Sequence, residues 1–82
     1  IITKRSEAVR MAILQDMERG VTVFQGEGGY TGEPKRVLLC AVSQSEVSRL
    51  ERLVSRIDPE AFMIVQSVSE VIGEGFRGFS AP

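Results

Sequence analysis

The residues best suited to act on another molecule lie in one short stretch, from Gln25 to Pro34. Four of the eight glycines of the chain fall within seven residues there, together with its one tyrosine. Glycine at this density indicates backbone with positive φ, or close approach of another group. Successive N–H groups in such a loop can form a nest for a small anion, with hydroxyl and cationic side chains beside it. The candidate binding residues are Gly26, Gly28, Gly29, Tyr30, Thr31, Gly32, Lys35 and Arg36. The alternative is a wide hairpin turn with bulges and no ligand.

A second glycine cluster, Gly73, Glu74 and Gly75, comes near the end of the chain, just before Phe76. It could close over a ligand or a neighbouring subunit, and we include its three residues in the candidate site. The alternative is an ordinary turn after a strand, with Phe76 folding back on the core.

Several kinds of chemistry are excluded by the residue types. The chain has no histidine, so it lacks the commonest general base and metal ligand. Its one cysteine, Cys40, lies in an apolar run and is expected to be a structural thiol in a reducing compartment. The glycine-rich loop has no lysine–serine pair of a phosphate-binding loop and opens no helix. We therefore expect no catalytic residue, no metal, no cofactor and no enzymatic activity.

Length and charge limit the partners further. The chain has 82 residues and a net charge of −1, with 10 basic and 11 acidic residues. Nothing in this balance favours nucleic acid. A membrane-spanning helix needs about 18 consecutive apolar residues, and no apolar run in the sequence approaches this length. We therefore expect this part of the protein to be soluble. We expect one domain over residues 1–76 and a tail over 77–82.

The elements that must position the glycine-rich loop follow from hydrophobic periodicity. Val9, Ile13 and Met17 form the apolar stripe of a first helix, which Gly20 is expected to end. Ser43 and Glu46 form a capping box for a second helix, which ends before Pro59. The β-forming segments are residues 1–3, 21–24, 36–42 and 61–67, with one short helical turn over 70–72.

The order of these elements predicts an α+β fold. It is a ferredoxin-like βαββαβ sandwich, with a four-stranded antiparallel sheet in the order 4-1-3-2 and two helices on one face. The segment 36–42 is apolar on both of its faces, so the sheet face without helices would also be apolar. An exposed apolar face of this kind favours association, and we expect a homo-oligomer, either a dimer or a trimer, formed through it.

Four motifs in order resemble the C-terminal domain of the YitT family of bacterial membrane proteins. They are GVTV with GEGGYTG over residues 20–32, VLLCAVS over 37–43, IDPEAF over 57–62 and VIGEGF over 71–76. The resemblance implies a fragment of a multi-pass protein on the cytoplasmic side of the bacterial plasma membrane, with a transmembrane segment of the parent chain as a partner. It also implies a fold similar to that of PII signalling proteins, which carry an effector loop at the corresponding hairpin. The start at Ile1 reads as the tail of a strand already under way.

These observations favour a regulatory or sensory domain that binds a small anionic ligand or a partner through the glycine-rich loop. The alternative is a structural oligomerisation module with no ligand.

Overall fold

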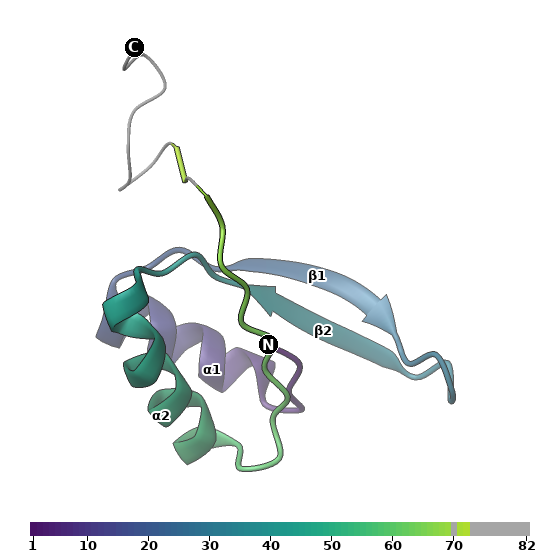
Figure 1. The fold of residues 1–82 in the computed structure, drawn as a ribbon. Coiled ribbons are helices and arrows are strands. Elements are labelled where there is room, and N and C mark those ends of the chain that lie inside the picture. Colours follow the sequence, from purple (N-terminus) through teal and green to yellow (C-terminus); the bar gives the residue numbers. More distant parts are fainter. Residues whose placement is uncertain (70, 73–82) are drawn as a thin grey trace.

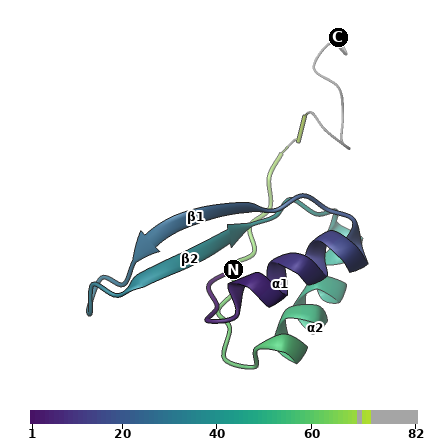
Figure 2. The same cartoon turned by 180° about the vertical axis from the view of Figure 1, so that it is seen from behind.

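The computed structural model describes residues 1–69, 71 and 72, and they form two helices packed on one side of a β-hairpin (Figures 1 and 2). Helix α1, Ser6–Ala12, continues as a short π-helix, η1, Ile13–Met17. Strands β1, Thr22–Glu27, and β2, Pro34–Leu39, form the hairpin. A 3₁₀ turn, η2, Gln44–Glu46, leads into helix α2, Val47–Ile57. The hairpin extends well beyond the helices (Figure 1).

The core lies between the helices and the near end of the hairpin. The predicted stripe of the first helix is confirmed, since Val9, Ile13 and Met17 are all buried. Leu38 from β2 is 2% exposed and packs on the same cluster. The buried side chains of α2 complete the core: Leu50, Leu53 and Val54. This core fixes which face of β2 is turned toward the helices.

The first helix ends earlier than predicted. The left-handed residue after it is Glu18, with φ 53°, whereas Gly20 was expected to occupy this position. The wider π-helical turn over Ile13–Met17 ends the helix at Met17, so the chain reverses before it reaches the glycine. A non-glycine residue therefore adopts a conformation that glycine adopts at lower cost.

The second helix begins and ends as predicted. The backbone N–H and the hydroxyl of Ser43 both donate to Glu46 Oε1, at 2.9 and 2.8 Å. The helix ends at Ile57, and Asp58 is extended before Pro59. Two contacts then tie the start of the chain to this end of α2. The Thr3 hydroxyl donates to Asp58 Oδ2 at 2.6 Å, and Arg5 Nη1 donates to the Ile57 carbonyl oxygen at 3.1 Å.

The two strands of the hairpin pair antiparallel, with Phe24 opposite Val37 and Thr22 opposite Leu39. The first strand is longer than the predicted 21–24, because its pairing continues to Glu27. The second strand was predicted to reach residue 42 but ends at Leu39. Its partner β1 begins at Thr22, so residues 40–42 have no partner on that side.

The other two predicted strands, 1–3 and 61–67, are reduced to isolated antiparallel bridges. Ile2 bridges Val37 on one side and Phe62 on the other. Among the described residues the sheet is therefore two-stranded, and the predicted four-stranded sheet is not confirmed. The reason lies in the register, because Ile64 and the residues after it lie level with positions before Ile1. The fold class is α+β.

No helix in the described part of the chain has the length and apolar character to cross a membrane. The predicted short turn over 70–72 lies partly outside the described residues, and residues 73–82 lie wholly outside them.

Candidate functional site

The glycine-rich stretch forms the tip of the β1–β2 hairpin, and its own hydrogen bonds hold it in shape. Gly28 N–H donates to the Glu33 carbonyl oxygen at 2.8 Å, and Gly32 N–H donates to the Gly28 carbonyl oxygen at 2.7 Å. The Glu33 N–H donates to the Thr31 hydroxyl oxygen at 3.2 Å. Three of the N–H groups that an anion nest would use are therefore already engaged inside the tip.

The geometry favours glycine at two positions of the tip. Gly32 has φ 73°, a left-handed conformation that other residues rarely adopt. At Gly28, an added Cβ would lie 3.1 Å from the Thr31 hydroxyl oxygen and 3.2 Å from Lys35 Cε. Gly29 differs from both, since its φ is not positive and a Cβ there would meet nothing within 4 Å.

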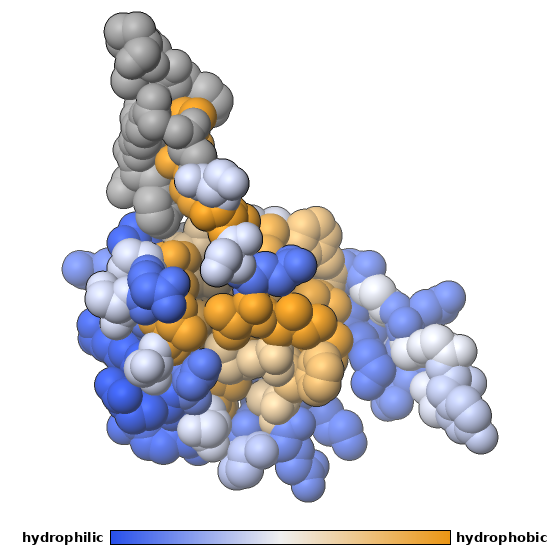
Figure 3. Space-filling view, viewed as in Figure 1, coloured by the Kyte–Doolittle hydropathy of each residue, from blue (hydrophilic) through white to orange (hydrophobic). Residues whose placement is uncertain are grey.

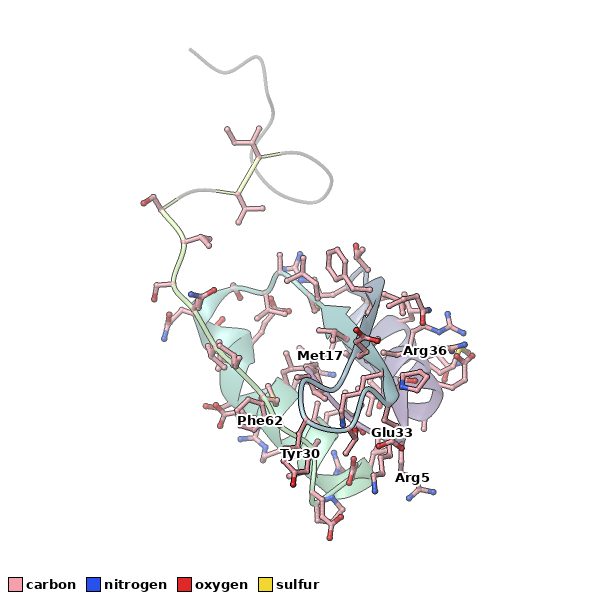
Figure 4. All side chains as sticks on the ribbon, turned by 90° about the vertical axis from the view of Figure 1, so that its right-hand side faces the viewer. Arg5, Met17, Tyr30, Glu33, Arg36 and Phe62 are labelled. Carbon is pink, nitrogen blue, oxygen red and sulfur yellow. The ribbon has the colours of Figure 1, made fainter. Side chains whose placement is uncertain are left out.

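Tyr30 is the most exposed of the large hydrophobic side chains in the described part of the chain. Its relative exposure is 101%, so it has no packing role within the described part of the chain. Figure 4 looks at the molecule from the hairpin side and shows Tyr30 and Glu33 on the tip. A wholly exposed tyrosine on a formed turn presents an aromatic ring and a hydroxyl to any molecule that approaches.

The two cations of the predicted site are separated. Lys35 and Arg36 are consecutive residues of β2, so their side chains leave opposite faces of the hairpin. Lys35 lies beside Gly28, since its Cε would be 3.2 Å from a Cβ added at Gly28. Arg36 lies on the helix side, where it adds to the effect of the Arg10 hydrogen bond in lowering the pKa of Glu7. The structure thus brings Lys35 to the tip residues but not Arg36.

Of the remaining predicted residues, Gly26 joins this group, and the three of the second glycine cluster are not described. Gly73, Glu74 and Gly75 lie outside the described residues. Gly26 lies in β1 opposite Lys35. Cys40 is half-buried against the core, and burial raises the pKa of its thiol, which makes it a poorer nucleophile.

A row of apolar side chains crosses the sheet on the face away from the helices. The pairs Phe24–Val37, Val37–Ile2 and Ile2–Phe62 place four residues in line, all on the face opposite to buried Leu38. Phe24 and Phe62, at its ends, are 50% and 61% exposed. Figure 3 shows apolar surface gathered in the middle of the molecule, between the polar hairpin tip and the polar surface of α2. This apolar row is the open face that the pattern of 36–42 predicted.

Sequence reasoning did not find the groove that continues from this row. It has a volume of about 840 Å³ and lies between the chain after β2 and the segment 63–68. One wall includes Leu39, Ala41 and Val42, and the other includes Ile64, Val65 and Val68. The signal that could have found it is the near-continuous apolar character of both segments.

Comparison with known proteins gives one family. A family model described as an uncharacterized protein conserved in bacteria (DUF2179) matches residues 19–73. No solved structure matches the chain.

Three relatives illustrate the similarity. The UPF0750 membrane protein YvjA of Bacillus subtilis (strain 168) is 48% identical over 77 residues, which cover 94% of this chain and 27% of that protein. An uncharacterized protein in the cccA 5′ region of Bacillus sp. (strain PS3) is 52% identical over 77 residues, covering 94% of this chain and 51% of that protein. The UPF0750 membrane protein YitT of Bacillus subtilis (strain 168) is 30% identical over 73 residues, which cover 89% of this chain and 26% of that protein. The chain therefore spans from about a quarter to about half of the length of these relatives.

Proposed function

The chain belongs to the bacterial family of uncharacterized proteins DUF2179, and its similarity to YitT agrees with the YitT-family resemblance of its motifs. From this premise we propose that it is a regulatory or sensory domain of a membrane protein. In this proposal the domain binds a partner or a small anionic ligand through the β1–β2 hairpin tip. It lies on the cytoplasmic side of the bacterial plasma membrane and acts on the membrane part of the same protein. It performs no catalysis.

The observation that carries this proposal is the pair Gly29–Tyr30. The turn itself accounts for Gly32 and Gly28, but neither φ nor packing within the described residues requires glycine at position 29. A missing side chain beside a wholly exposed tyrosine suits a surface that another molecule approaches closely.

Within this proposal a partner surface is favoured over a small anion. Three N–H groups of the tip are engaged in its own hydrogen bonds, and Arg36 lies on the other face from Lys35. Two carboxylates, Glu27 and Glu33, flank the tip and would repel an anion. An exposed aromatic ring next to backbone that no side chain covers is typical of a contact that anchors a protein partner.

Two experiments test the proposal. Thermal unfolding is measured with ATP, cyclic dinucleotides, inorganic phosphate and Mg²⁺, because a ligand at 100 times its Kd adds about 2.7 kcal/mol and raises Tm by roughly 10–20 °C. In the full-length protein, a benzophenone side chain at position 30 reports a partner by photo-crosslinking, with position 15 as the control site.

We expect either a Tm increase or a crosslink specific to position 30, and the loss of either in Gly29→Leu. A Tm increase should also be lost in Tyr30→Ala. The absence of any shift with all four probes, together with equal crosslinking from positions 15 and 30, would exclude the proposal.

The finer fold proposed here is the ferredoxin-like, PII-like sheet of four strands. It is supported by the two bridges of Ile2, which lie between Val37 and Phe62 in the order that this topology requires. Both helices also lie on the same side of the hairpin (Figure 2).

A second candidate function is an oligomerisation module. The observation that favours it is the apolar row Phe24, Val37, Ile2 and Phe62, which the helices leave uncovered. A second copy would bury this row, giving a dimer or a trimer. Static light scattering over a range of concentrations tests this candidate, and a mass that stays monomeric at high concentration would exclude it.

A further inference from the structure

The groove beside β2 has the form of an empty strand position. Ile1 and Leu38 exchange backbone hydrogen bonds, with Leu38 N–H to the Ile1 carbonyl oxygen at 2.9 Å and the Ile1 nitrogen to the Leu38 carbonyl oxygen at 2.8 Å. On its other side, Ile2 exchanges two bonds of 2.8 Å with Phe62. A single extended segment is thus bonded on both edges, as a central strand is, but only over Ile1 and Ile2.

Both neighbours of this segment continue past Ile1. In an antiparallel ladder, the residue directly before Ile1 falls between Leu39 and Ile64, and the second residue before Ile1 falls between Cys40 and Val65. These positions coincide with the groove of about 840 Å³, whose walls are residues 39–42 and 63–68.

The backbone groups facing the groove follow the same alternation. Since bonded pairs recur every second residue, the N–H and C=O groups of Cys40 and Ile64 are directed into the groove. Among the described residues, neither Cys40 nor Ile64 bonds to another backbone group outside regular elements, and neither lies in a strand. Backbone groups lined up in this way form the template for an added strand.

We propose that the residues immediately preceding Ile1 in the full-length protein fill this groove as the central strand of the sheet. The first residue before Ile1 exchanges hydrogen bonds with Ile64, and the second exchanges them with Cys40. The relatives of this chain are considerably longer than it is, which leaves room for such a segment. The inference does not depend on the function of the hairpin tip.

The side chains of the groove specify the character of this strand. Leu39 is 58% exposed and Ile64 is 69% exposed, and both flank the first position before Ile1. Among the described residues, none of the side chains lining the groove is charged. An apolar residue at each of the two positions would bury this surface, since the second position faces the core side together with Ile1 and half-buried Cys40.

A disulfide tests the register directly. In the full-length protein with its native cysteines replaced, including Cys40→Ser, cysteines are placed at Leu39 and at the first residue before Ile1. This pair is a non-hydrogen-bonded one, with Cα atoms about 4.5 Å apart, which suits a disulfide. The matched control keeps the cysteine before Ile1 and pairs it with Thr22→Cys in place of Leu39→Cys, because Thr22 lies opposite Leu39 on the far side of β2, one strand further away. We expect a disulfide to form rapidly within one chain when the cysteine before Ile1 is paired with Leu39→Cys, and none to form when it is paired with Thr22→Cys.

Amide hydrogen exchange provides the second measurement. The amides of Cys40 and Ile64 should exchange at least about tenfold more slowly in the full-length protein than in the 82-residue chain, as expected for one added hydrogen bond each. The Glu7 amide, in the first turn of α1 and outside both the groove and the hairpin tip, is the internal control and should not change. A disulfide found only between two chains would assign the groove to a second copy. Equal exchange in the two proteins, with no disulfide, would also overturn the proposal.

Discussion

The Arg19 guanidinium and the Glu46 carboxylate join the end of the first helix to the start of the second. Arg19 Nη2 donates to Glu46 Oε1 at 2.9 Å, and Arg19 Nε lies 3.2 and 3.3 Å from the two carboxylate oxygens. The same Glu46 accepts the capping bonds of Ser43. The Glu46 carboxylate therefore both links the end of the first helix to the second and caps the start of the second helix.

Acid should weaken the fold through this carboxylate. The hydrogen bonds from Arg19, and then those from Ser43, lower the pKa of Glu46 from 4.5 to about 2. Because the folded-state pKa is depressed, the stabilisation is fully present above pH 4.5 and is lost as the pH falls through 2. We expect urea midpoints of the wild-type chain to fall more steeply over this window than those of Glu46→Gln. The control is Glu51→Gln, an exposed position on α2, which should keep the wild-type slope. Parallel slopes for all three proteins would contradict the prediction.

Replacing Glu18 by glycine should stabilise the protein. Glu18 has φ 53°, which costs a non-glycine residue about 1–2 kcal/mol, while the added freedom of glycine in the unfolded chain removes about 0.5–1 kcal/mol of that gain. We expect a net gain of about 0.5–1 kcal/mol in the free energy of unfolding, measured by urea denaturation. Gln15→Gly, inside the preceding helix, is the matched control and should cost about 0.5–1 kcal/mol. A loss of stability in Glu18→Gly would show that the left-handed residue is not strained.

The helices could be predicted from the sequence because their signals are local. The stripe Val9, Ile13 and Met17 and the capping pair Ser43 and Glu46 each act within a few residues, and both were confirmed. The predicted end of the first helix was wrong because a π-helical turn over Ile13–Met17 moves the left-handed position to Glu18. Hydrophobic spacing alone does not indicate such a turn.

The strands and the site were harder to predict because they depend on partners. Apolar character over 36–42 indicates β structure, but the length of a strand is set by what lies beside it, and β2 ends where β1 and Ile1 provide no further pairing. For the site, the glycine count located the hairpin tip. It did not indicate that Lys35 and Arg36 leave opposite faces, nor that the tip bonds its own N–H groups.

Adjacent leucines of β2 should differ strongly in their effect on stability. Leu38 is 2% exposed and faces the helices, whereas Leu39 is 58% exposed on the other face. Leu38→Ala should cost about 2–5 kcal/mol in the free energy of unfolding, through lost burial and the cavity left behind. Leu39→Ala should cost less than about 1 kcal/mol in the monomer. Similar losses for the two variants in urea denaturation would show that the faces of β2 are assigned wrongly.

A charge on the apolar row should prevent association without unfolding the domain. Phe24 is half exposed on the face away from the helices, so Phe24→Asp leaves the core intact and places a carboxylate in any interface formed there. If copies associate through this row, light scattering should report a monomer for Phe24→Asp and a larger mass for the wild-type chain. The control is Leu14→Asp, a position of 40% exposure on the first helix, which should retain the wild-type mass. A Phe24→Asp variant that keeps the larger wild-type mass would place the interface elsewhere.

Alanine at three glycines of the hairpin tip should separate the needs of the turn from those of binding. Gly32→Ala forces a side chain into φ 73° and should cost about 1–2 kcal/mol. Gly28→Ala brings a Cβ to 3.1 Å from the Thr31 hydroxyl, which bonds the Glu33 N–H, so a smaller loss of about 0.5–1 kcal/mol is expected as that bond shifts. Gly29→Ala meets no atom within 4 Å and should be neutral or raise stability by about 0.4–1 kcal/mol, because it restricts the unfolded chain. Urea denaturation ranks the three variants. A marked loss in Gly29→Ala would mean that the turn needs this glycine after all, and would remove the observation on which binding at the hairpin tip rests.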